Sequence, residues 1–255
     1  MLRDAQASSG TRVLAVSSQS IADAPGFDTS HTLVWLGQTP DERHWVASLG
    51  WEGDEPDLEW TSLRQILVGP DDDFSAIASQ AMALARWHED HGFSPADGSP
   101  SEAVHAGWMR RDGAGRLHFP RTDPAVIVLI RDAADERILL ANNVAWEPQR
   151  FSLIAGFVDP GESLESAVQR ECLEETALDV EQIRYVRSQP WPFPRSLMVG
   201  FSAVARDPES VEVDGVEIRA ARWLHRDEVE QGVVGLPGHE SIARRLITQW
   251  LARDI

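Results

Sequence analysis

Acidic side chains recur at helical spacing in the segment GFVDPGESLESAVQRECLEETAL, which runs from Gly156 to Leu178. Residues three and four positions apart share one face of a helix, so Glu171, Glu174 and Glu175 are expected to project together. Like charges at this spacing repel each other, and a hard divalent cation with oxygen ligands relieves the repulsion. Mg²⁺ takes a few carboxylates and completes its shell with waters and substrate phosphates, so the pattern predicts metal-assisted phosphate chemistry.

The rest of the segment supports a helix that packs on one side. Its apolar residues can lie against a sheet, and Arg170 is placed to pair with a carboxylate and fix its orientation. Gly156 and Gly161 allow the backbone to approach a phosphate or a metal. A solvent-facing helix with ordinary Glu–Arg pairs explains any single glutamate but not the joint pattern. At about one in fifteen per specified residue, six fixed positions occur by chance about once in ten million windows.

The segment resembles the Nudix box, which is Gly, five residues, Glu, seven residues, Arg-Glu, an apolar residue, any residue, Glu-Glu, any residue, Gly and an apolar residue. Every defining position matches except Ala177, which stands where the box has a glycine. If that glycine ends the helix in a left-handed turn, a non-glycine residue there costs about 1 kcal/mol. The departure therefore concerns the end of the helix rather than the acids.

The resemblance implies an α+β fold, a Nudix αβα sandwich, with Mg²⁺ or Mn²⁺ as the cofactor. It implies that catalysis depends on Glu162, Arg170, Glu171, Glu174 and Glu175. The implied metal-binding residues are Ala155 through its backbone carbonyl, Glu171, Glu174, Glu175 and Glu217. Glu171 and Glu175 are the expected direct ligands, Glu174 is a ligand or the base that acts on water, and Glu162 supports the metals through water or holds Arg170.

A second motif, SQPWPFPRS, covers residues 188–196. Three prolines alternating with Trp191 and Phe193 give a rigid, extended segment that has little entropy left to lose. Two aromatic rings held in this way can line a pocket that stacks a flat ring, although a structural loop or a proline-rich recognition ligand has the same composition. The nonamer resembles the motif that follows the Nudix box in the NADH pyrophosphatase branch of the family, where it shapes the dinucleotide site. The implied substrate-binding residues are Gln189, Pro190, Trp191, Pro192, Phe193, Pro194, Arg195 and Ser196.

Four further positions match substrate-contacting residues of that branch. Phe157 matches an aromatic residue that stacks on the nicotinamide, and Ala243 matches a contact near the C-terminus. Arg64, in SLRQIL, matches an N-terminal arginine on the strength of a few residues. Phe119 stands where the branch has a tyrosine before a proline, so a ring for stacking is present without its hydroxyl.

Members of that branch commonly carry a zinc ribbon of four cysteines, and this chain departs from the pattern. Ser94, Asp97, Asp112 and Gly115 stand at the corresponding places, and the one cysteine of the chain is Cys172. None of the four supplies a thiolate, so we expect no zinc. The segment is expected to persist as a metal-free loop, held by packing around residues such as Trp108.

The elements that position these motifs predict three parts. Residues 1–92 form a β-rich domain with strands at 11–17, 31–37 and 43–50 and a helix that begins at 71–73 and ends before Gly92. Residues 93–118 have little periodicity and predict a loop or linker. Residues 119–255 form the Nudix domain, with strands at 125–131, 137–141, 197–205 and 220–224 and helices at 163–176 and 239–253. The mixture of hairpins and helices favours an α+β or αβα layered domain.

Charge and composition narrow the class of protein. Lys and Arg number 23 against 41 Asp and Glu, which gives a net charge of −18 and argues against non-specific grip on a nucleic-acid backbone. A salt-adapted or high-GC source explains the same acidity equally well. The N-terminus lacks the apolar core of a signal peptide, and no run is long enough for a membrane span, so we expect a cytoplasmic protein. A homodimer is expected by resemblance.

Together the motifs predict hydrolysis of the diphosphate of NADH or NAD⁺ to the nicotinamide mononucleotide and AMP. Removal of NAD caps from RNA 5′ ends is a related prediction, because that end presents the same diphosphate. One alternative is a broader hydrolase of ADP-ribose or dinucleoside polyphosphates. Another, of a different class, is a non-catalytic NAD-binding sensor.

Overall fold

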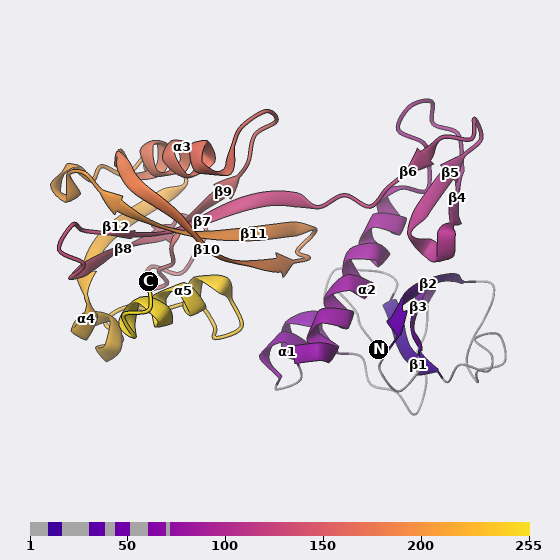
Figure 1. The fold of residues 1–255 in the computed structure, drawn as a ribbon, viewed down its shortest axis with the longest axis horizontal. Helices are drawn as coiled ribbons and strands as arrows, with labels where there is room; N and C mark the ends of the chain where they lie inside the picture. The colour runs from indigo at the N-terminus through magenta and orange to yellow at the C-terminus, as the bar shows by residue number, and fades with distance from the viewer. Residues whose placement is uncertain (1–9, 17–30, 39–43, 52–60, 70–71) are drawn as a thin grey trace. The chain divides into compact units, whose positions relative to one another are not determined.

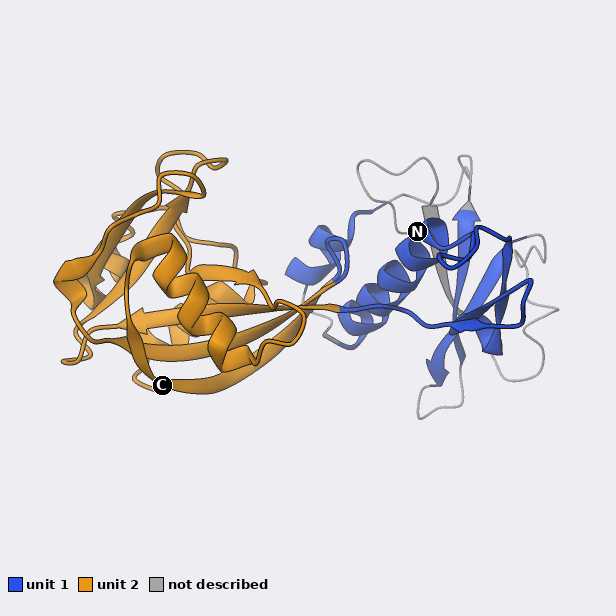
Figure 2. Cartoon of the chain, turned by 90° about the horizontal axis from the view of Figure 1, so that it is seen from above, with its two compact units in different colours: residues 1–122, 192–195 blue, residues 123–191, 196–255 orange. Residues whose placement is uncertain are grey.

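The computed structural model of this chain describes residues 10–16, 31–38, 44–51, 61–69 and 72–255. The chain forms two compact units (Figure 2). Unit 1 comprises residues 1–122 and 192–195, and unit 2 comprises residues 123–191 and 196–255. The predicted strand residues Ser17 and Arg43 and the predicted helix start at Asp71 lie outside the described residues.

Unit 1 contains an antiparallel sheet of three strands in the order β1-β3-β2, namely β1 Gly10–Val16, β2 Thr32–Gln38 and β3 His44–Trp51. Two helices follow, α1 Leu63–Val68 and α2 Asp72–Asp90. Alanines of α2, together with Met82 and Leu84, pack with Val34, Ala47 and Leu63 to form the core of the unit. The three predicted strands and the long helix are confirmed. The short helix α1, which begins at a capping box of Ser62 and Gln65, was not predicted.

The prediction of a loop or linker over residues 93–118 is wrong, because the segment folds into a second small antiparallel sheet in the order β4-β5-β6. Its elements are β4 Ser101–Val104, the 3-10 helix η1 His105–Gly107, β5 Met109–Asp112 and β6 Leu117–His118. The prediction that Trp108 helps to hold the segment is confirmed. Its indole Nε1 donates to the carbonyl of Trp35 at 2.7 Å, and it packs against the core of unit 1.

The buried carboxylate of Asp112 organises this small sheet. It accepts hydrogen bonds from Ser94 Oγ at 2.8 Å and Arg116 Nε at 2.7 Å, and His118 Nε2 lies 3.0 Å away. Arg116 also pairs with Asp97. Burial by itself would raise the pKa of Asp112, but these hydrogen bonds outweigh burial and hold it well below its usual range. Hydrogen bonds and ion pairs therefore connect three of the four positions that were compared with zinc ligands.

Unit 2 is built on a mixed sheet in the order β10-β11-β7-β8-β12, with β9 also paired to β7. The strands are β7 Asp123–Arg131, β8 Arg137–Asn143, β9 Ile154–Phe157, β10 Val180–Trp191, β11 Ser196–Ala205 and β12 Ile218–His225. β11 runs parallel to β7 and the other pairs are antiparallel. The predicted hairpin across residues 132–136 is confirmed, whereas β9 and β10 were not predicted.

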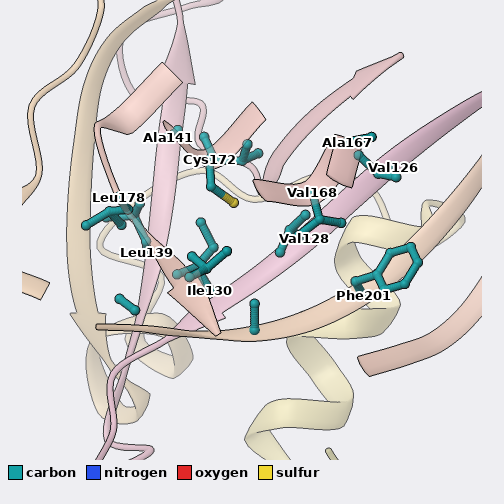
Figure 3. Close-up of a cluster of buried hydrophobic side chains, with 14 of the residues drawn as sticks. Val126, Val128, Ile130, Leu139, Ala141, Ala167, Val168, Cys172, Leu178 and Phe201 are labelled. Atoms are coloured by element: carbon teal, nitrogen blue, oxygen red, sulfur yellow. The ribbon is translucent and has the colours of Figure 1, made fainter. Parts of the chain in front are cut away.

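Helices cover both faces of this sheet (Figure 1). On one face lies α3 Leu164–Thr176, and on the other lie α4 Arg226–Gln231 and α5 Ile242–Leu251. Residues of β7 alternate between the two cores: Val126 and Val128 pack with α3, and Ile127 and Leu129 pack with α5. Figure 3 shows the first of these cores, where Val168 and Cys172 of α3 pack with strand residues such as Val128 and Leu139. A central strand with both faces covered reads as one apolar run, and the predicted α+β sandwich is confirmed.

Across the described segments, none of the helices combines the length and the apolar character that a membrane crossing requires.

Candidate active site

The acidic face of α3 is fixed by how the helix begins, packs and ends. Ser163 caps the helix by accepting from Ser166 N at 3.1 Å. Ala167, Val168 and Cys172 are fully buried against the sheet, which fixes the direction in which the glutamates of the helix project. The helix ends at Ala177, whose left-handed backbone has φ 57° and ψ 12°. The chain therefore retains the turn that glycine favours, at a cost of about 1 kcal/mol.

Arg170 joins the predicted catalytic residues into one network. Its Nε and Nη2 donate to the two carboxylate oxygens of Glu162 at 3.0 and 2.9 Å. Its Nη1 donates to Glu171 Oε1 at 2.7 Å and to Glu174 Oε2 at 3.1 Å. The remaining contact runs from Nη2 to the carbonyl of Phe157 at 2.8 Å. Hydrogen bonds from Arg170 lower the pKa of Glu162, so this pair is ionised at neutral pH.

Glu175 and Glu171 form the buried part of the acidic face. Glu175 is 6% exposed, and its Oε2 has no hydrogen-bond partner among the residues that the structure describes. Desolvation, together with the charges of Glu171, Glu217, Asp214 and Glu174, raises the pKa of Glu175 to about 8. Desolvation also raises the pKa of Glu171, although Arg170 opposes the shift. A buried carboxylate without a partner needs either a proton or a cation.

Gly156 makes room for this pair of acids. It lies in β9 opposite Val126 of β7, directly after Ala155. A Cβ atom on Gly156 would lie 2.0 Å from the carboxyl carbon of Glu171, so any larger residue would displace that carboxylate. The motif therefore requires glycine at this position because the carboxylate of Glu171 lies too close to the backbone to leave room for a side chain.

The donor set fits a hard divalent cation. It consists of the carboxylates of Glu171 and Glu175, with the charge of Glu217 acting on both and the strand residue Ala155 beside Gly156. Over the described ranges, no three Asp, Glu, His or Cys side chains are already arranged as a complete set of ligands. The two carboxylates suit Mg²⁺, which binds a few protein oxygens, keeps several waters and takes further oxygens from substrate phosphates.

Asp214 was not predicted from the sequence. Its carboxylate accepts from the backbone N–H groups of Glu217 and Ile218 at 2.9 and 2.8 Å, which fixes the loop that carries Glu217. Its charge also contributes to the raised pKa of Glu175. An aspartate followed by a glycine before a strand is the signal for such a turn, and it was available in the sequence.

The predicted substrate residues of unit 2 occupy different environments. Phe157 is the last residue of β9 and is 56% exposed, which leaves a face of its ring available for stacking. Ser196 is buried at the start of β11, where it pairs with Trp191 at the end of β10. Ala243 belongs to α5 and is 4% exposed on the side of the helix that faces the core, so contact with a substrate would involve its backbone.

The predicted residues Arg64 and Phe193 contact each other in unit 1, to which residues 192–195 belong. The guanidinium of Arg64 lies 4.3 Å from the ring centroid of Phe193, and that ring packs against the core of the unit. Arg86, which was not predicted, donates to the carbonyls of Pro192 and Pro194. One face of Phe193 is thus covered by a cation. Phe119 also belongs to unit 1, and its ring is 59% exposed.

Residues 121–250 match the family model described as the NUDIX domain. A NUDIX hydrolase from Nitrosomonas europaea of known structure is 21% identical with a TM-score of 0.51, and the match covers 64% of this chain and 92% of that one. At this identity the likeness concerns the fold alone. The layered fold, the acid-bearing helix and the family match agree, and the chain belongs to the Nudix family of hydrolases. Nudix hydrolases generally need a divalent metal.

Within that family, the chain is similar to NAD-capped RNA hydrolases. The NAD-capped RNA hydrolase NudC of Mycobacterium bovis (strain BCG / Pasteur 1173P2) is 42% identical over 258 residues, which cover 94% of this chain and 81% of the relative. The NAD-capped RNA hydrolase NudC of Stutzerimonas stutzeri (strain A1501) is 38% identical over 222 residues, which cover 86% and 78%. Both alignments extend well beyond the Nudix domain.

Proposed function

We propose that this chain hydrolyses the diphosphate bond of NADH and NAD⁺, both free and as the 5′ cap of RNA. The products are the nicotinamide mononucleotide and either AMP or an RNA with a 5′ monophosphate. The observation that carries the proposal is the buried carboxylate of Glu175 beside Glu171, whose Oε2 finds no hydrogen-bond partner in the described part of the chain. The extensive similarity to NAD-capped RNA hydrolases supports the choice of substrate.

In this proposal Glu171 and Glu175 hold Mg²⁺ or Mn²⁺, with Glu217 and the carbonyl of Ala155 as further oxygen donors. The bound metals would neutralise the diphosphate and lower the pKa of a water. Arg170 orients the acids, because its guanidinium donates to Glu162, Glu171 and Glu174 at once. Glu162 pairs with Arg170 Nη2 at 2.9 Å and thereby helps to fix the guanidinium.

Glu174 is proposed to take the proton of the attacking water. Its side chain is 61% exposed, and Arg170 Nη1 holds its Oε2 at 3.1 Å, which leaves Oε1 for the water. A carboxylate oriented in this way can accept a proton as the phosphorus–oxygen bond forms. The proton would then pass to bulk solvent from Glu174.

For the substrate bases, Phe157 is proposed to stack on the nicotinamide. Its carbonyl accepts from Arg170 Nη2 at 2.8 Å, which links the orientation of this strand residue to that of the acids. Gln189 through Ser196, Ala243, Phe119 and Arg64 stay predictions for the remainder of the substrate site. A guanidinium already covers one face of Phe193, so a base could stack only on its other face.

The test is chromatographic analysis of products from NADH, NAD⁺, ADP-ribose and an NAD-capped RNA, each with Mg²⁺ or Mn²⁺. We expect AMP and the mononucleotide from the nicotinamide substrates, with kcat/KM for NADH well above that for ADP-ribose. A higher value for ADP-ribose would favour the broader hydrolase, and tight NAD binding without AMP release would favour a sensor. A triphosphate RNA of the same sequence is the control for cap removal.

Variants of α3 assign the activity to the proposed site. Glu175→Gln is expected to lower kcat by at least about a thousandfold, because it removes a charged metal ligand without changing side-chain volume. Glu165→Gln is the matched control, since Glu165 lies in the first turn of the same helix and is exposed. Wild-type rates in Glu175→Gln would contradict the assignment.

We also propose a homodimer, which sedimentation velocity of the wild-type chain will test.

A further inference from the structure

Gln189 uses both ends of its side-chain amide within unit 2. Its Nε2 donates to the carbonyl of Glu240 at 2.7 Å, and its Oε1 accepts from the backbone N–H of Ile242 at 2.6 Å. The two partners are 51 and 53 residues away along the chain. Because Nε2 faces a carbonyl and Oε1 faces an N–H, the two hydrogen bonds also assign the nitrogen and oxygen positions of the amide.

These contacts fall at the beginning of α5. Ile242 is its first helical residue, and its N–H is among those that a helix cannot satisfy by itself. Ser241 caps the helix by accepting from Arg244 N at 3.3 Å. Gln189, which lies on strand β10, accepts from a second N–H of this turn, that of Ile242. The first turn of α5 is therefore held both by its own cap and by the sheet.

Close packing at the same place supports a fixed distance between β10, β11 and α5. A Cβ on Gly200 of β11 would lie 3.0 Å from Ile242 Cδ1 and 3.1 Å from Leu246 Cδ1. The same Cβ would lie 3.1 Å from the carbonyl oxygen of Arg187 on β10. The absence of a side chain at Gly200 lets α5 approach the strands closely enough for Gln189 to reach its backbone.

We propose that Gln189 is a positioning residue, which holds the start of α5 against the strand that leads into Trp191. The inference rests on the proposed function, in which Trp191 and Ala243 contact the substrate. Gln189 lies two residues before Trp191, and its partner Ile242 lies directly before Ala243. The side chain thus fixes these two candidate contacts relative to each other, and acts on substrate binding through them.

The test combines kinetics with hydrogen exchange. In Gln189→Ala we expect KM for NADH to rise about tenfold, with kcat within about threefold of wild type, because two hydrogen bonds that position the binding residues are lost. Exchange of the Ile242 amide in the protein without substrate should quicken by about tenfold or more. Unchanged exchange in Gln189→Ala would contradict the view that Gln189 holds the start of α5. A fall in kcat at constant KM would contradict the positioning role.

A second pair of variants distinguishes positioning from direct contact. Ile242→Pro removes the N–H that donates to Gln189 Oε1. Proline is tolerated there because Ile242 is the first helical position. Ile242→Val retains the N–H and is the control. If Gln189 acts through α5, Ile242→Pro raises KM as Gln189→Ala does, and the double variant is no worse than either. Additive effects, or a normal KM in Ile242→Pro, would show that Gln189 contacts the substrate itself. If the wild type releases no AMP, the proposed function and this role fall together; if the wild type is active and Gln189→Ala matches it, this role alone falls.

Discussion

The buried carboxylate of Glu175 makes metal-free protein sensitive to alkaline pH. The pKa of an ordinary glutamate is 4.5, and burial with neighbouring acids raises that of Glu175 to about 8 in the folded chain. The folded state therefore holds this proton more tightly than the unfolded state does. As pH rises from 4.5 to 8 the free energy of unfolding falls, and above pH 8 the full penalty for a buried charge is present.

The size of the effect follows from the shift. Each pH unit between the two pKa values removes about 1.4 kcal/mol of stability, so the interval from pH 5.5 to 8 corresponds to about 3 kcal/mol. Glu175→Gln cannot ionise and should lose none of this amount, although its amide leaves a buried polar group that costs about 1 kcal/mol at every pH. The variant is thus expected to be less stable than wild type at pH 5.5 and more stable at pH 8.5.

The assay is urea unfolding in EDTA at the two pH values, with hydrogen exchange of α3 amides as the specific reporter of unit 2. Glu165→Gln, on the exposed side of the helix, should follow wild type. Added Mg²⁺ should restore the alkaline stability of wild type and leave Glu175→Gln unaffected, since a cation that binds the folded state stabilises it. Parallel loss of stability in wild type and Glu175→Gln between these pH values would refute the reasoning.

Three further variants test other parts of the structure. Ala177→Gly should raise the free energy of unfolding by about 0.5–1 kcal/mol by relieving the left-handed backbone, measured by urea unfolding; no change would show that the helix end is unstrained. Gly156→Ala should lower kcat/KM by about a hundredfold or more, because its Cβ displaces the carboxylate of Glu171, while circular dichroism stays native. Asp112→Asn should lower the melting temperature of unit 1 at pH 7. Because the pKa of Asp112 is depressed in the folded state, this difference should shrink as pH falls below about 4, and a difference independent of pH would contradict the ion-pair account.

The acid-bearing helix was predictable because its determinants are local. Spacing alone brings Glu171 and Glu175 to one face, and the cap at Ser163 and the turn at Ala177 delimit the helix within the same short segment. Strand β7 was predictable for a similar reason, since a central strand with both faces covered is continuously apolar. The fold class follows from these elements together.

The parts that were missed depend on contacts between distant residues. Strand β10 has mostly polar or half-buried residues and two irregularities in its pairing with β11, so its alternation is weak. The small sheet over residues 101–118 is held by Asp112 and its polar partners, which replace an apolar pattern that a sequence would reveal. Gln189 is the same case, because its partners lie some fifty residues further on and are backbone atoms.

Residues 192–195 belong to unit 1 although they lie between two strands of unit 2. The polypeptide therefore crosses from one unit to the other three times, after residues 122, 191 and 195. A single proteolytic cut after residue 122 separates residues 1–122 from a fragment that still carries residues 192–195 of unit 1. A fragment that begins at Asp123 would carry Phe193 without the arginines that cover it, and the exposed ring would make that fragment prone to self-association. A gene fusion or truncation designed to isolate unit 2 must therefore also account for residues 192–195, which belong to unit 1.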